Sequence, residues 1–236
     1  MKLDAILWDY DDTLVNSAPK NIDITINILS IVAPHLTGDS LPKYLLTEDL
    51  YHEANHSAKN WQELYVDYYG LSHDEMLLAG SLWAEHQEKN QTQVELYNGI
   101  SDAVAQFSYL NHGVCSQNSQ TNIRRVLTDN GIVTPFKTIV VYDDVSSENQ
   151  KPNSFGGVKC LESICDSTNS KLVMYIGDHE TETKFAHNLQ LDLANKTKVI
   201  SVAAAYSRSN PEKWAIKPDY VAHNVEDLFS IIGKYV

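Results

Sequence analysis

Short apolar runs that stop at polar residues recur along the chain and predict the strands of a buried sheet. The first covers residues 3–8, Leu-Asp-Ala-Ile-Leu-Trp, and ends at a cluster of acids. Similar runs rich in β-branched residues cover residues 113–115, 138–142, 172–176 and 199–203. Nearly continuous apolar runs of this length are typical of parallel strands that are covered on both faces.

Segments with helical spacing lie between these runs. Residues 119–130 end just before Gly131, a residue type suited to the end of a helix. Residues 154–166 carry apolar side chains every three or four positions, and residues 180–189 and 224–232 have a similar pattern. Strands that alternate with helices predict an α/β fold with a doubly wound parallel sheet.

Residues 16–97 break this alternation, since they contain no convincing strand. Helices are predicted in their place, and the last of them begins with a capping box formed by Ser72 and Glu75. We therefore expect an α/β core domain made of residues 1–15 and 98–236, with an all-helical cap domain inserted between them. The predicted helices of the insertion cover residues 19–33, 47–69 and 72–90.

Composition narrows the class of protein. The chain has 236 residues, of which 43% are hydrophobic and 21% are charged, as in an ordinary globular protein. The net charge of -13 argues against nucleic acid and anionic membranes, but not against a small anionic substrate held by a metal and a few cations. No run reaches the roughly 18–20 apolar residues of a membrane span.

The location of the protein follows from its N-terminus and its cysteines. Residues 1–12 have no long apolar segment and no cleavage site of small residues, so no signal peptide is predicted. Cys115, Cys160 and Cys165 are odd in number and form no metal-type pair, which favours reduced thiols. We expect a cytoplasmic protein.

Acidic residues follow two of the predicted strands. Asp9 and Asp11 come after the first, and Asp178, Glu180 and Glu182 after a later one. Carboxyl ends of parallel strands meet at one edge of a sheet, and clustered carboxylates need a cation, so the pattern predicts a Mg²⁺ site there. Loop acids and an acidic first helical turn are the ordinary alternative, which explains Glu180 and Glu182 better than Asp178.

A hydroxyl and a lysine complete the candidate site. Ser116 follows a predicted strand, and with the backbone N–H groups of Gln117 and Asn118 it could bind a phosphate at a helix N-terminus. Ser116, Asn118 or Ser119 could instead simply cap that helix. Lys151 stands before a proline and a predicted helix, although a single lysine is usually just solvated.

These residues occur together, and in the same order, as in the motifs of the haloacid dehalogenase-like superfamily, which the chain resembles. The resemblance extends over residues 3–229, and the helical insertion is similar to the C1-type cap of phosphoglycolate phosphatase-like members. It implies a Rossmann-like core with a cap. The four motifs correspond to Asp9-Tyr10-Asp11-Asp12-Thr13, Ser116, Lys151-Pro152, and Gly177-Asp178 with Glu182.

The resemblance implies a role for each catalytic residue. Asp9 would attack phosphorus and form an aspartyl-phosphate. Asp11 would protonate the leaving oxygen and then deprotonate the water that hydrolyses the intermediate. Ser116, Gln117 and Lys151 would bind the phosphoryl oxygens, because phosphoryl transfer depends mainly on positioning and charge neutralisation.

The resemblance also implies a set of metal ligands. Mg²⁺ would be held by Asp9, Asp11 through its backbone carbonyl, Asp178 and Glu182. Glu182 replaces the more common aspartate, and Glu180 could substitute for it. A second departure is Asp12, which occupies a position where glycine is most common; aspartate tolerates such turns well.

The implied function is Mg²⁺-dependent hydrolysis of a small phosphorylated metabolite of the phosphoglycolate or sugar phosphate type. Alternatives are a 5′-nucleotidase, since Asp11-Asp12-Thr13 resembles the pyrimidine nucleotidase-type members, and a phosphosugar mutase. The presence of Asp11 argues against a dehalogenase. The two departures also leave open a non-catalytic protein that binds phosphate and metal.

The predicted cap carries one group of polar and aromatic side chains that could contact the leaving group. His52, His56 and either Lys59 or Asn60 would share a helix face, next to Trp61. A wetted helix face is the ordinary alternative. We expect hinges for cap motion near residues 15–17 and 97–99.

Overall fold

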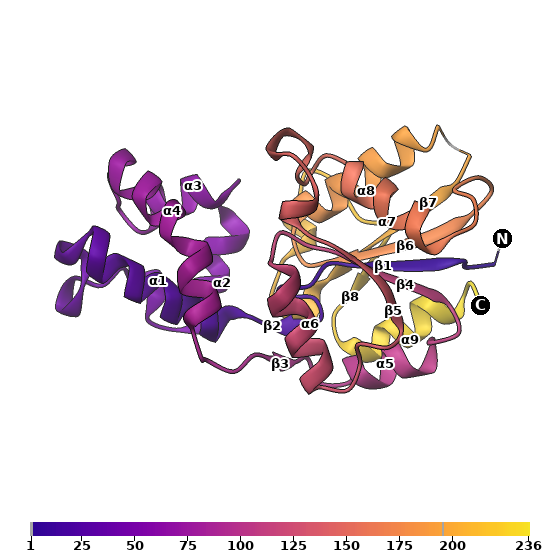
Figure 1. Ribbon diagram of the computed structural model, residues 1–236, viewed down its shortest axis with the longest axis horizontal. Coiled ribbons are helices and arrows are strands. Elements are labelled where there is room, and N and C mark those ends of the chain that lie inside the picture. Colours follow the sequence, from indigo (N-terminus) through magenta and orange to yellow (C-terminus); the bar gives the residue numbers. More distant parts are fainter. Residues whose placement is uncertain (1, 195) are drawn as a thin grey trace. The chain divides into compact units, whose positions relative to one another are not determined.

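The computed structural model describes residues 2–194 and 196–236, which form two compact units (Figure 1). The first unit consists of Met1–Asn16 and Glu95–Val236, and the second of Ser17–Val94. The first unit contains the sheet and the second is helical.

The return to the sheet unit lies earlier in the chain than the sequence suggested. Glu95–Leu96 (β3) pairs antiparallel with Val15–Asn16 (β2), and the Tyr97 N–H donates to the Leu14 carbonyl at 3.1 Å. Two strands of two residues each are too short to produce a hydrophobic pattern, so they could not be predicted from the sequence.

The sheet unit is built on six parallel strands in the order β5-β4-β1-β6-β7-β8. Each predicted strand is present, although β5 begins and ends two residues earlier than its apolar run. The central strand β1 is buried along its whole length, as expected of a strand with neighbours on both sides. The strands are Ala5–Trp8 (β1), Asn111–Cys115 (β4), Phe136–Val140 (β5), Leu172–Gly177 (β6), Lys198–Ala204 (β7) and Tyr220–Ala222 (β8).

Helices cover both faces of this sheet. Figure 1 shows α7 and α8 on one face and α5, α6 and α9 on the other, which is the doubly wound arrangement that the alternating pattern predicted. Helix α5 was not expected, since its seven residues give too short a pattern. These helices are Ile100–Gln106 (α5), Gln120–Asp129 (α6), Phe155–Ile164 (α7), Glu180–Asp192 (α8) and Val225–Gly233 (α9).

One apolar core of the sheet unit lies under α7 and α8. It is made of side chains from β1, β6 and both helices, with Leu7, Tyr175, Leu161 and Phe185 almost fully buried. The cysteines are free thiols, as expected, and Cys160 is part of this core. The burial of these side chains fixes the strand ends, and thereby the residues that follow them.

The helical unit has its own core around helix α1. Ile24, Ile28 and Leu29 of α1 are buried together with Tyr65 and Met76 from later segments. The capping box at the start of α4 is confirmed. The helical elements are Ala18–Val32 (α1), Glu48–Ser57 (α2), Trp61–Glu63 (α3), a π-helical turn at Leu64–Tyr68, and His73–Lys89 (α4).

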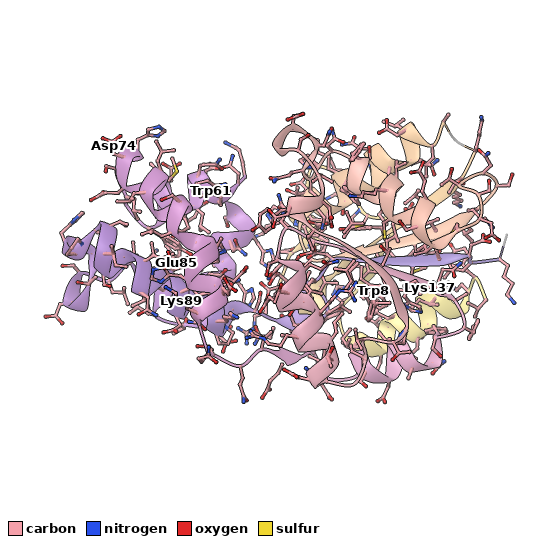
Figure 2. The ribbon with its side chains drawn as sticks, viewed as in Figure 1. Trp8, Trp61, Asp74, Glu85, Lys89 and Lys137 are labelled. Carbon is pink, nitrogen blue, oxygen red and sulfur yellow. The ribbon has the colours of Figure 1, made fainter. Side chains whose placement is uncertain are left out.

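The single helix predicted over residues 47–69 is broken. Ala58 has an extended backbone, and the Asn60 side chain accepts from the Glu63 N–H at 2.9 Å, so a new helix begins there. Trp61 then lies across Gly80, whose missing Cβ would come within 2.6 Å of the indole ring. Figure 2 labels Trp61 and the exposed Glu85–Lys89 pair of α4.

Within the part of the chain that the structure describes, no helix combines the length and the apolar character needed to cross a membrane.

Candidate active site

Lys151 joins two carboxylates at the carboxyl edge of the sheet. Asp9 directly follows β1, and its backbone N–H donates to the Ile176 carbonyl of β6 at 2.8 Å. The Lys151 ammonium donates to Asp9 Oδ1 at 2.7 Å and to Glu182 Oε2 at 2.8 Å. It also lies 5.5 Å from the ring centroid of Phe185. A cation that is charged, buried and bound at two points cannot be the solvated lysine of the ordinary alternative.

Glu182 reaches Lys151 because Gly177 leaves room for it. A Cβ at Gly177 would lie 2.5 Å from Glu182 Cβ, so only glycine allows the first turn of α8 to pack this closely on the end of β6. The Tyr175 hydroxyl also donates to Glu182 Oε2. Glu182 thus accepts two hydrogen bonds inside the protein, and its geometry is that of a residue that orients Lys151.

The loop that carries Lys151 is tied to α8. The Asn188 side chain donates to the Pro152 carbonyl at 2.7 Å, and Ser154 donates to the Asp192 carboxylate. These contacts hold the Lys151 ammonium in position relative to Glu182, which is part of α8.

Asp11 faces a different partner from Asp9. The chain turns after Tyr10, and Asp12 lies in the left-handed region at φ 54°. Aspartate adopts this conformation more readily than most residues, as we expected for this position. The Asp11 carboxylate accepts from Asn118 Nδ2, at 3.1 Å to Oδ1 and 2.9 Å to Oδ2.

Ser116 lies at the end of β4 and is almost fully buried. Its Oγ accepts from the Asn118 N–H at 3.1 Å. The sequence suggested that this N–H would bind a phosphate, but in the structure it makes a hydrogen bond within the loop. Ser119 is the residue that caps α6. Ser116, the exposed Gln117 and Lys151 line one pocket beneath the loop of residues 142–153.

The acids at this edge repel one another. Burial, aided by the charges of Glu182 and Asp11 and opposed by Lys151, raises the pKa of Asp9 to about 8. Burial also raises the pKa of Asp178 well above its usual range, with added contributions from the charges of Asp12 and Asp9. Burial by itself would lower the pKa of Lys151, but Asp9 and Glu182 outweigh it and hold that pKa above its usual value.

This donor set fits a divalent cation. Asp9 and Asp178 are buried and sense each other's charge, and one lysine does not balance the carboxylates around them. A hard cation would lower the cost of keeping both ionised, and Mg²⁺ completes its shell with water.

The three side chains expected around the metal, those of Asp9, Asp178 and Glu182, are not grouped as one ligand set. Among the described residues, no three His, Cys, Asp or Glu side chains are placed to hold an ion. Glu182 is engaged by Lys151 and Tyr175 instead. The alternative Glu180 accepts from the Ile216 N–H at 2.8 Å, so it is also engaged elsewhere.

The residues expected to face the leaving group do not share one helix face. Helix α2 ends at Ser57, before Lys59 and Asn60. His52 is 2% exposed and stacks on His56, with 5.7 Å between the ring centroids. His52 therefore packs within the helical unit and is not part of an open polar surface.

The side-chain contacts of Tyr175, Asn118 and Asn188 were not foreseen from the sequence. Tyr175 and Gly177 are two apart on β6, and the alternation of a strand could have placed Tyr175 beside the end of the strand. Asn118 is two residues from Ser116, but its contact with Asp11 spans 107 positions along the chain. Asn188 gave no signal at all.

Residues 6–196 match the family model described as haloacid dehalogenase-like hydrolase. The chain belongs to this family. The DxDxT string, Ser116, Lys151 and Asp178 all lie in the matched region, in a fold of the expected kind.

Solved structures agree with this membership of the haloacid dehalogenase-like (HAD) family at the level of the fold. A provisionally named phosphoglycolate phosphatase from Lactobacillus plantarum is 16% identical, with 98% of this chain and 100% of that chain covered and a TM-score of 0.75. A HAD-superfamily hydrolase of subfamily IA, variant 1, from Geobacter sulfurreducens is 17% identical, with 98% and 97% covered and a TM-score of 0.62.

A third structure similar to this HAD-like hydrolase contains a metal. The provisionally named HAD-hydrolase YfnB from Bacillus subtilis, described as bound to magnesium, is 18% identical, with 98% and 99% of the chains covered and a TM-score of 0.62. A search of curated proteins found no match.

Proposed function

We propose that this HAD-like hydrolase is a Mg²⁺-dependent phosphomonoesterase that acts through an aspartyl-phosphate on Asp9. The observation that carries the proposal is the bridge from Lys151 to Asp9 and Glu182, since Lys151 also lines a pocket with Ser116. A cation beside a carboxylate nucleophile suits a phosphoryl group, whose oxygens carry negative charge.

The proposed reaction has two steps. In the first, an Asp9 oxygen forms a bond to phosphorus while the bond to the leaving oxygen breaks, and Asp11 gives its proton to that oxygen. In the second, water attacks the phosphorus of the acyl phosphate, and Asp11 takes a proton from that water. Inorganic phosphate leaves, and the Asp9 carboxylate and the Asp11 proton are restored.

The other residues bind and orient the group that is transferred. Lys151 and the Ser116 hydroxyl donate to phosphoryl oxygens, and Glu182 with Tyr175 keeps the ammonium aimed at them. Asp9, Asp178 and the Asp11 carbonyl would hold Mg²⁺, which neutralises charge on the phosphoryl oxygens and on the nucleophile. Magnesium bound to a structure similar in fold supports this choice of metal.

The proposed substrate is a small phosphorylated metabolite of the phosphoglycolate or sugar phosphate type. Support comes from the name of a protein with a similar fold and from the net charge of -13, which disfavours nucleic acid. Nucleoside monophosphates belong in the same panel of substrates. Glucose 1-phosphate separates a hydrolase from a mutase, since the first releases phosphate and the second makes glucose 6-phosphate.

The test is phosphate release from a panel of phosphomonoesters, with Mg²⁺ and with EDTA. We expect release that needs Mg²⁺ and that falls at least a thousandfold in Asp9→Asn, because the nucleophile is lost. Asp129→Asn, at the exposed end of α6, is the matched control and should keep wild-type activity. Full activity in Asp9→Asn, or no release from any ester by folded protein, would refute the proposal.

A further inference from the structure

Asn118 connects two of the proposed functional residues through two different groups. Its side-chain Nδ2 donates to both oxygens of Asp11, at 3.1 and 2.9 Å, and its backbone N–H donates to Ser116 Oγ at 3.1 Å. The residue is 4% exposed, so water does not easily replace either contact.

The orientation of the Asn118 amide is fixed by its neighbours. Its Oδ1 accepts from the Ser119 N–H at 2.7 Å and from Asn122 Nδ2 at 3.1 Å. The Asn122 amide is oriented in turn, because its Oδ1 accepts from Arg125 at 3.0 Å. A flipped Asn118 would set its oxygen against the Asp11 carboxylate and its NH₂ against two donors, so only one orientation satisfies all groups.

This orientation has a chemical consequence for Asp11. The Asn118 NH₂ group can only donate a hydrogen bond, so a protonated Asp11 cannot give its proton to Asn118. The proton is therefore left to another acceptor, which in the proposed function is the leaving oxygen. An acceptor at the same position would instead draw the proton away from the substrate.

The backbone contact acts on Ser116 in the same sense. Since Ser116 Oγ already accepts from the Asn118 N–H, its own proton remains available to a phosphoryl oxygen. One residue therefore directs the protons of two groups toward the reacting ester.

We propose that Asn118 is a positioning residue that directs the Asp11 proton to the leaving group. This role rests on the proposed function, in which Asp11 is the general acid. It predicts that Asn118 matters most when the leaving group needs a proton, since general acid catalysis contributes about 10²–10⁴-fold for such reactions.

The test compares two esters whose leaving groups differ in their need for protonation. p-Nitrophenyl phosphate releases a stable phenolate, whereas glycerol 2-phosphate releases an alkoxide that must be protonated. The quantity measured is kcat/KM, which covers the steps up to cleavage of the P–O bond and excludes hydrolysis of the intermediate. Asp11→Asn removes the group that donates the proton, so its effect on the ratio of kcat/KM between the two esters gives the full size of the effect.

The decisive variant is Asn118→Asp. Its Oδ1 still accepts from Ser119 and Asn122, so the loop and the cap of α6 are retained, but the donor to Asp11 becomes an acceptor. We expect kcat/KM for glycerol 2-phosphate to fall at least tenfold more than kcat/KM for p-nitrophenyl phosphate. The added negative charge affects both phosphate dianions alike and cancels in this ratio.

Two further variants separate this role from a structural one. Asn118→Ala removes the donor without adding an acceptor, and should show the same selective loss to a smaller degree. Asn130→Asp, at the other end of α6, repeats the chemical change where the amide donates to the Val126 carbonyl, and should leave the ratio unchanged.

The outcomes are distinct. A ratio in Asn118→Asp equal to that of the wild type, while Asp11→Asn shows its selective loss, overturns the role of Asn118 and leaves the proposed function intact. Equal losses on both esters also overturn it, since a merely structural residue would act in that way. Wild-type protein that hydrolyses neither ester refutes the proposed function, and this role with it.

Discussion

His112 should make the stability of the sheet unit depend on pH. The side chain is fully buried, its Nδ1 accepts from Trp8 Nε1 at 3.1 Å, and its Nε2 lies 2.8 Å from the Phe107 carbonyl. Both ring nitrogens are therefore satisfied in the neutral form with the proton on Nε2. Burial lowers the pKa of His112 below its ordinary value of 6.5, and the Phe107 carbonyl opposes this only in part.

The sign and size of the effect follow from proton linkage. Below pH 6.5 the unfolded chain binds a proton that the folded chain does not, so acid favours unfolding and stability falls as the pH falls. One proton gives at most about 1.4 kcal/mol per pH unit. Between roughly pH 7 and pH 5, the loss from this histidine is at most about 2 kcal/mol.

The assay is urea unfolding of the wild type and His112→Gln from pH 7 to pH 5. Glutamine can accept from Trp8 and donate to Phe107 but cannot titrate, so the free energy of unfolding of the wild type should fall more steeply. His223→Gln, at an exposed position, should keep the slope of the wild type. If wild type and His112→Gln have parallel curves over this range, His112 is not held neutral by the fold.

Three other perturbations have defined outcomes. Gly177→Ala should lower the free energy of unfolding by about 1–3 kcal/mol and reduce phosphatase activity, because its Cβ would displace Glu182; equal thermal stability and activity would contradict this. Tyr69→Phe should leave stability unchanged or raise it by up to about 1 kcal/mol, because this buried hydroxyl has no hydrogen-bond partner among the described residues; a clear drop in the melting temperature would reveal one. Mg²⁺ at a hundredfold excess over its Kd should stabilise the protein by about 2.7 kcal/mol, EDTA should reverse this, and Asp178→Asn should abolish it in the same melts.

Much of the fold could be predicted from the sequence, because the sheet is built from continuous apolar runs with helices between them. Each run from residue 3 to residue 203 became a strand, and the acids that end β1 and β6 marked the edge at which the site is found. The positions at which helices end were harder to predict. The end of α2 at Ser57 depends on an extended Ala58 and an Asn60 cap, which a search for helical periodicity passes over.

Sequence by itself indicated the residues that we propose carry the chemistry, because a strand end must expose the residues that follow it, and because Asp9, Ser116, Lys151 and Asp178 follow the motif order of a known family. It could not determine how those residues divide their contacts. Glu182, a predicted metal ligand, accepts a hydrogen bond from Lys151, and Asp11 accepts one from an asparagine 107 positions away. Such contacts depend on distances across neighbouring strands and helices, to fractions of an ångström, and only the packed tertiary structure sets those distances.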